Sequence, residues 1–106
     1  MPKPPYEHAW YKLYAYLIPE ALDEGWNRDR ILFELNKENA PVFSGSCSEI
    51  YLEKCMIDNH DQNNRLLVAK NLGDTSLMFL VHPTIDANSL NLYISKIINV
   101  LNKAER

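Results

Sequence analysis

The stretch from Ser44 to Glu49, SGSCSE, places three short hydroxyl side chains, a thiol and a carboxylate within six consecutive positions. Small polar residues of this kind can cap a helix, or they can let the backbone come close to a polar ligand. The residues that follow predict a helix from about residue 48 to Met56, capped by Ser46 or Ser48. The stretch is therefore either a loop with a cap or the border of a ligand site.

Two other combinations of reactive side chains are conceivable. Cys47 and Cys55 could bind a metal together with His60, or Cys47 could be a nucleophile with His82 as its base. The sequence contains no CxxC or HxxxH pair, the spacing typical of a zinc site. A buried thiol and an exposed histidine explain these residues more simply, and we predict no metal.

Glu49, Glu53 and His82 also have two interpretations each. The two glutamates are four residues apart and would share a helix face, where paired carboxylates can do acid–base chemistry. A solvated helix face explains them better. His82 ends a hydrophobic stretch just before Pro83, and the ends of strands are places where side chains meet ligands. The alternative is a histidine bonded to nearby backbone.

The composition excludes several classes of protein. The chain has 106 residues and a formal net charge of −3, which gives no basic surface for nucleic acid or for an anionic membrane. Its apolar runs are far shorter than the roughly 20 residues of a membrane span. The three glycines are isolated, which argues against a phosphate-binding loop. Two cysteines and no visible signal peptide fit a reduced, cytoplasmic chain.

Hydrophobic patterns predict three strands. Residues 1–7, with three prolines, predict a linker or a cut made between two domains. Residues 8–18 predict a strand that is buried on both faces and therefore central. Strand alternation places Trp10, Tyr14 and Tyr16 on one face and Tyr11 with Leu13 and Leu17 on the other. Short strands follow at residues 41–43 and 75–82.

Capping residues and helical spacing predict the helices. Asn27 starts a helix with Ile31, Leu32 and Leu35 on its inner face, and Pro41 stops it. A short helix over residues 66–72 is stopped by Gly73. The longest helix runs from Thr84 or Asp86 to about Ala104, with Leu90, Ile94, Ile97, Ile98 and Leu101 on one face. We predict an α+β domain, a small and mostly antiparallel three-stranded sheet with helices packed on it.

Three segments together resemble the C-terminal small domain of the DegT-type sugar aminotransferases. They are HAWYKLYAYL, GWNRDRILFELNKENAPVFSGSCSEIYLEK and RLLVAKNLGDTSLMFLVHPTI, in order from about His8 to Leu101. The resemblance implies that residues 8–106 are the small domain of a pyridoxal-phosphate enzyme with the aspartate-aminotransferase fold. It implies transfer of an amino group, usually from glutamate, to a nucleotide-linked keto-sugar used in lipopolysaccharide, O-antigen or antibiotic sugar biosynthesis. It also implies a homodimeric full-length enzyme.

The resemblance also suggests which residues face the substrate. Many family members carry His-x-aromatic-His on the first strand, and here Tyr11 replaces the second histidine. Gly45 and Ser46 stand where many members have His-Tyr, in a segment that lies at the mouth of the active site in the family. The substrate-facing candidates are Tyr11, Ser46, Cys47, Ser48, Glu49 and His82. No residue of this chain is assigned to catalysis or to the cofactor.

Two alternatives from other classes remain open. The chain could be a stand-alone binding or regulatory module, or a structural domain that docks on a separate catalytic chain. A fold alone supports many functions. An upstream reading frame that carries a lysine in a Ser/Phe-rich setting would favour the aminotransferase.

The resemblance places the cofactor lysine on the large N-terminal domain of the same polypeptide, in a Ser/Phe-rich segment. None of the seven lysines of this chain has that setting: Lys3, Lys12, Lys37, Lys54, Lys70, Lys96 and Lys103. We therefore expect the chain by itself not to retain pyridoxal phosphate after mixing and gel filtration, measured by absorbance at the Schiff-base band. A borohydride-reducible adduct at one specific lysine would contradict this expectation.

Overall fold

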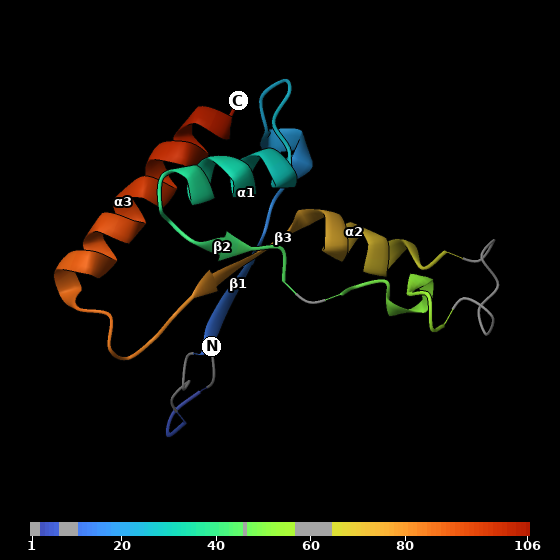
Figure 1. Ribbon diagram of the computed structural model, residues 1–106, viewed down its shortest axis with the longest axis horizontal. Coiled ribbons are helices and arrows are strands. Elements are labelled where there is room, and N and C mark those ends of the chain that lie inside the picture. Colours follow the sequence, from blue (N-terminus) through green and yellow to red (C-terminus); the bar gives the residue numbers. More distant parts are fainter. Residues whose placement is uncertain (1–2, 7–10, 46, 57–64) are drawn as a thin grey trace.

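The computed structural model describes residues 3–6, 11–45, 47–56 and 65–106. In order, the elements are β1 (Lys12–Tyr16), η1 (Pro19–Ala21), α1 (Arg28–Lys37), β2 (Val42–Phe43), η2 (Ile50–Leu52), α2 (Leu67–Thr75), β3 (Ser76–Leu80) and α3 (Ala87–Ala104). The strands form an antiparallel sheet in the order β1-β3-β2. Figure 1 shows α1 and α3 on the same side of this sheet, whereas α2 extends beyond its end. The predicted α+β class with a three-stranded antiparallel sheet is confirmed.

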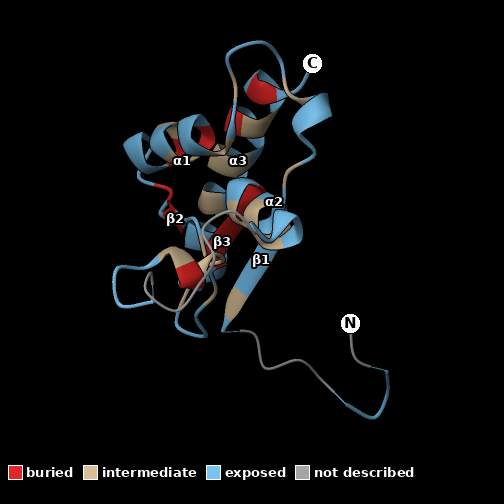
Figure 2. Ribbon diagram, turned by 90° about the vertical axis from the view of Figure 1, so that its right-hand side faces the viewer, coloured by how far each residue is buried: buried red, intermediate tan, exposed pale blue. Residues whose placement is uncertain are grey.

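The core lies between the sheet and the pair α1 and α3 (Figure 2). Ile31 and Leu35 of α1 are fully buried, as predicted, and Leu32 packs against the same cluster. The sheet and α3 complete the cluster with Val42, Leu77, Phe79, Val100 and Ala104. One face of the sheet therefore supplies the core.

Asn27 caps α1 as predicted, because its Oδ1 accepts a hydrogen bond of 2.9 Å from the Arg30 amide. The helix was predicted to be stopped by Pro41, but it ends earlier, at Lys37. Asn39 adopts a left-handed conformation with φ 57°, and the Ala40 amide bonds back to the Leu35 carbonyl at 2.9 Å. This is the hydrogen-bond pattern of a helix end built around a left-handed residue. The helix has already ended when the chain reaches Pro41.

The prediction that the first strand is central was wrong. Its described part, β1, is an edge strand, and β3 is the central strand. Tyr14 and Tyr16 are 43% and 55% exposed, whereas Ala15 and Leu17 pack against the core. The predicted alternation of faces therefore holds over the described part. Within this part of β1, it is the face with Ala15 and Leu17 that packs against the core, and Trp10 lies outside the described residues.

Two predicted helix features were also wrong. The stretch expected to be helical up to Met56 contains only the short 3₁₀ helix Ile50–Leu52, and no side chain caps it. Gly73 does not end α2, which continues to Thr75 with Ser76 as its C-cap. The reason is that the helix does not turn left-handed at Gly73. This glycine instead allows a close contact with another segment, described below.

Asp86 caps α3 as predicted, accepting hydrogen bonds from the Asn88 and Ser89 amides at 2.9 and 3.0 Å. The predicted apolar face is covered only in part. Ile97 and Leu101 pack against the core. The other three side chains of this face are 42–50% exposed, namely Leu90, Ile94 and Ile98. Among the described residues, no helix combines the length and the apolar character needed to cross a bilayer.

The full burial of Leu35 makes it a test of this core. Leu35→Ala should lower the free energy of unfolding by about 2–5 kcal/mol, because it removes buried methyl groups and leaves a cavity. Phe33 lies on the same helix but is 65% exposed. The matched control Phe33→Ala should change the free energy by no more than about 0.5 kcal/mol. Denaturant unfolding of the chain measures both, and equal effects would contradict the assignment of the faces of α1.

Candidate functional site

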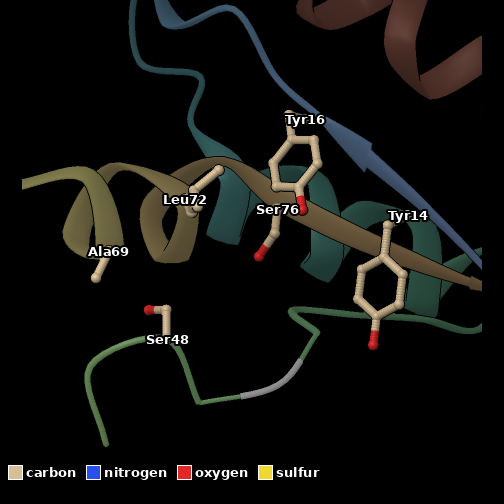
Figure 3. A pocket seen from close by; sticks show the side chains of 6 residues that line it. All are labelled: Tyr14, Tyr16, Ser48, Ala69, Leu72 and Ser76. Carbon is tan, nitrogen blue, oxygen red and sulfur yellow. The ribbon is translucent and has the colours of Figure 1, made fainter. Parts of the chain in front are cut away.

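A pocket of about 230 Å³ lies where β1, the start of β3, α2 and Ser48 meet. Its lining consists of Tyr14, Tyr16, Ser48, Ala69, Leu72 and Ser76. Figure 3 shows the two tyrosine rings on the same side of the sheet as Ser76, with Ser48 facing α2 across the space. A second pocket of about 330 Å³ shares Ser48 and is lined by Cys47, Glu49, Arg28 and Asp74, among others. Together they combine hydroxyl groups with apolar walls, which suits a ligand with many hydroxyls.

Gly45 brings the SGSCSE stretch against the sheet. It has φ +89°, and a side chain there would place its Cβ 3.1 Å from the ring of Tyr14. The hydroxyl of Ser76 donates a hydrogen bond to the Ser44 carbonyl. The small residues thus allow the SGSCSE stretch to lie close to the sheet. Ser48 then forms part of the wall of the pocket.

Gly73 allows the same stretch to approach α2. A Cβ at Gly73 would lie 2.1 Å from Ser48 Oγ and 3.2 Å from Ser48 Cβ. The Gly73 carbonyl accepts a hydrogen bond of 2.8 Å from Arg28 Nη1, which links α2 to the start of α1. The position of Ser48 therefore depends on the absence of a side chain at residue 73.

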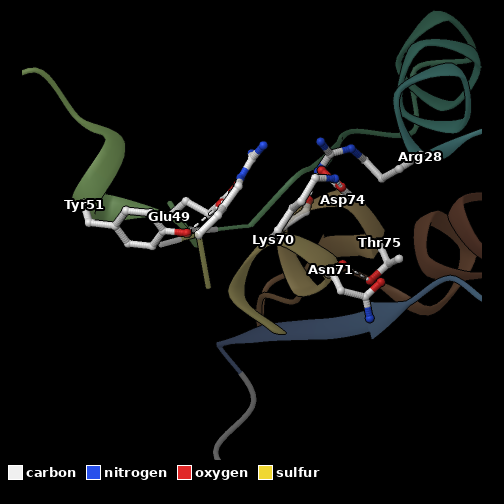
Figure 4. A network of polar contacts seen from close by, with 9 residues as sticks. Arg28, Glu49, Tyr51, Lys70, Asn71, Asp74 and Thr75 are labelled. Carbon is white, nitrogen blue, oxygen red and sulfur yellow. Dashed lines mark hydrogen bonds and ion pairs between the residues drawn. The ribbon is translucent and has the colours of Figure 1, made fainter. Parts of the chain in front are cut away.

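Glu49 is held in a polar cluster with Arg65 and Tyr51, and Figure 4 shows Glu49 beside the Tyr51 ring. Both Arg65 donors, Nε and Nη2, lie 2.7 Å from the two carboxylate oxygens, and the Tyr51 hydroxyl donates to Oε1 at 2.7 Å. The hydrogen bonds from Arg65 and then Tyr51 lower the pKa of Glu49 to about 2. A carboxylate that stays ionised near neutral pH is a poor proton donor. Glu49 is therefore an ionised carboxylate that ties Arg65 to Tyr51.

The expected pairing of Glu49 with Glu53 on a helix face was wrong, because the segment is not a helix of that length. Glu53 instead accepts a hydrogen bond of 3.2 Å from the Cys47 thiol, and this bond raises the pKa of Cys47. A thiol with a raised pKa is less often the reactive thiolate. Cys47 is exposed, not buried as the simpler interpretation expected, and so is Cys55. Within the described part of the chain, no three metal-binding side chains cluster.

The substrate-facing candidates fall into two groups. Cys47, Ser48 and Glu49 lie together at the Ser76 end of β3. His82 lies beyond the other end, exposed, with Nδ1 2.7 Å from Thr84 Oγ1.

Tyr11 lies near the His82 end as well, because its neighbour Lys12 pairs with Leu80. It is 73% exposed. Ser46 lies outside the described residues. A role for any of these residues at the substrate stays a prediction.

Sequence reasoning did not name Tyr14, Tyr16, Leu72, Ser76 or Arg65 as site residues. Strand alternation already placed the two tyrosines on one face, and that was the available signal. Arg65 pairs with Glu49, which lies 16 positions earlier, and Leu72 lines the same pocket as Ser48, which lies 24 positions earlier. No local pattern predicts such pairs.

A solved structure is similar to this chain, "X-ray structure of the aminotransferase from Psychrobacter cryohalolentis", at 48% sequence identity and a TM-score of 0.83. The match covers 92% of this chain and 25% of that chain. No protein-family model and no curated protein matches the sequence. This chain thus has the fold of one part of an aminotransferase, and it spans about a quarter of the length of that protein.

The contact between Gly73 and Ser48 predicts a coupling between the two positions. Gly73→Ala should gain up to about 1 kcal/mol of helix propensity when Ser48 is replaced by glycine. In the presence of Ser48 that gain should be lost or reversed, because the new methyl group displaces the serine side chain. Unfolding free energies of the two single variants and the double variant measure the coupling, expected at about 0.5–3 kcal/mol. Additivity of the two changes would contradict the contact.

The low pKa of Glu49 predicts a defined pH dependence. Its folded value of about 2 lies below the ordinary 4.5, so its ion pair should stabilise the fold fully above about pH 4.5. That contribution should be lost as the pH falls toward 2. Unfolding free energies measured across this range should fall less steeply for Glu49→Gln than for the natural chain. Glu38→Gln, an exposed control, should keep the natural slope, and an unchanged slope for Glu49→Gln would contradict the assignment.

Proposed function

We propose that this chain is the C-terminal small domain of a DegT-type, pyridoxal-phosphate-dependent aminotransferase. The observation that carries the proposal is the 48% identity to an aminotransferase over 92% of the chain, with a TM-score of 0.83. The reaction we propose is transfer of an amino group from glutamate to a nucleotide-linked keto-sugar, in the biosynthesis of cell-surface polysaccharide or antibiotic sugars. The sugar substrate rests on the sequence resemblance and on the hydroxyl-lined pocket.

We expect the described residues not to hold pyridoxal phosphate by themselves. This cofactor needs a lysine to bind its aldehyde and a set of donors for its phosphate. Lys70 pairs with Asp74 on α2 (Figure 4), Lys37 pairs with Glu34, and Lys12 lies 5.2 Å from the ring centroid of Tyr11. Neither of the two pockets has a lysine in its lining. The proposal therefore places the cofactor on the large N-terminal domain of the same polypeptide, in a cytoplasmic homodimer.

What this chain would contribute is one wall of the substrate site. Tyr14, Tyr16, Ser48 and Ser76 line the pocket with hydroxyl groups that can donate to and accept from sugar hydroxyls. Arg28 is held in place by Asp29 and the Gly73 carbonyl, at 2.7 and 2.8 Å, and adds a positive charge to the neighbouring pocket. A nucleotide-linked sugar carries phosphate groups, which a guanidinium ion attracts.

The test uses the complete gene product that contains this chain. We expect it to retain pyridoxal phosphate and to form 2-oxoglutarate from glutamate when a nucleotide-linked keto-sugar is supplied. Ser48→Ala should lower kcat/KM for the sugar by about 2- to 10-fold, since a lost hydrogen bond costs about 0.5–1.5 kcal/mol. Ser95→Ala is the matched control, because the Ser95 hydroxyl bonds to the Leu92 carbonyl on α3. A product that transfers no amino group to any such sugar would overturn the proposal.

A further inference from the structure

A third pocket, of about 280 Å³, lies between the segment that follows β1, the start of α1 and the end of α2. We call it the Trp26 pocket. Its volume is near the lower end of the range of about 300–1,000 Å³ that is typical of small-molecule sites, so its ligand is small. It shares Arg28 and Asp74 with the pocket that contains Cys47, and no residue with the pocket drawn in Figure 3. The lining of the Trp26 pocket therefore decides which ligand fits.

One part of this lining is apolar and held in place by the fold. It consists of Leu17, Pro19, Leu22 and Trp26. Three of these side chains, Leu17, Leu22 and Trp26, also pack against the core. The guanidinium group of Arg30 lies 4.2 Å from the centroid of the Trp26 ring, a cation–π contact that fixes the indole. A preformed apolar wall of this kind suits a hydrocarbon or aromatic group.

The other part of the lining is polar and carries one charge of each sign. It consists of Asn27, Arg28, Asn71, Asp74 and Thr75. Figure 4 shows Arg28 of α1 directed toward α2, the helix that carries Asn71 and Asp74. The Thr75 hydroxyl is already used, because it donates to the Asn71 carbonyl at 2.8 Å. The two charged side chains and the Asn71 carboxamide are therefore the groups that can select a ligand.

Each of these three side chains keeps free hydrogen-bonding capacity. Nε and Nη1 of Arg28 are bonded within the protein, but Nη2 donates to no group among the described residues. Asp74 pairs with Lys70 through Oδ2, whereas its Oδ1 accepts no hydrogen bond from the described part of the chain. The Asn71 carboxamide likewise has no partner within the residues that the structure describes. A cationic donor, an anionic acceptor and an amide thus border one small cavity with an apolar wall.

We propose that the Trp26 pocket binds a free α-amino acid with an apolar side chain. Nη2 of Arg28 donates to the α-carboxylate, the α-ammonium group donates to Oδ1 of Asp74, and the side chain lies against Trp26. A phosphate ion would meet the negative charge of Asp74, and a pure hydrocarbon would leave the polar groups unused. An amino acid carries both charges on one carbon beside an apolar body, which matches the lining. This inference goes beyond the proposed reaction and does not depend on it.

The test is equilibrium dialysis of radiolabelled L-leucine against the complete polypeptide that contains this chain. We expect saturable binding. Three competitors each lack one recognised group: 4-methylpentanoate has no ammonium, 3-methylbutylamine has no carboxylate, and glycine has no apolar side chain. Each should displace the label at least about 10-fold less effectively than unlabelled L-leucine. The absence of saturable binding, or equal competition by any of the three, overturns the proposal.

Substitution locates the bound leucine. Asn71→Ala weakens binding by about 2- to 10-fold, because it removes a carboxamide that bonds to the ligand. The matched control Asn102→Ala, on α3, leaves binding unchanged. Both asparagine side chains are exposed and make no hydrogen bond to the described residues, so both variants keep the melting temperature of the natural polypeptide. Equal binding by the two variants places leucine elsewhere and overturns the Trp26 pocket, whether or not the polypeptide transfers amino groups.

Discussion

The antiparallel pairing of β3 with its two neighbours is the constraint on which the other elements depend. β1 and β2 both pair with β3, and the inner side chains of β3, Leu77 and Phe79, form the core with α1 and α3. α2 runs directly into β3, and Ser76 at that junction holds the Ser44 carbonyl. The core and the hydroxyl-lined pocket therefore share one strand, so a shift of β3 would disturb both.

Local signals in the sequence were sufficient for most of the framework. Asn27 and Asp86 cap helices because their side chains reach amides two or three residues ahead, which is a property of the local sequence. Gly73 was assigned the wrong role for the same reason. Its position near the end of a helix suggests a cap, whereas its contact is with Ser48, twenty-five positions earlier. The shape of the candidate site depends on such distant contacts, so sequence patterns alone could not predict it.

The errors about burial have a different cause. The pattern of β1 indicated two covered faces, and the pattern of α3 indicated that Leu90, Ile94 and Ile98 are packed. In the structure Tyr14, Tyr16 and these three side chains are exposed by about two fifths or more. Hydrophobic patterns report all the surfaces that a segment buries in its final assembly. The two disagreements therefore have a common explanation if both surfaces contact parts of a larger protein.

The ion pair between Glu49 and Arg65 has a consequence for variation in chain length. The pair, together with the Leu66 amide bonded to the Tyr51 hydroxyl at 3.0 Å, joins the two ends of the segment that separates the SGSCSE stretch from α2. Because the ends are fixed to each other, extra residues between them need not move either the pocket or the helix. Doubling the length of a flexible loop costs only about 0.6 kcal/mol in closure entropy. An insertion between Met56 and Arg65 should therefore leave both the pocket and α2 in place.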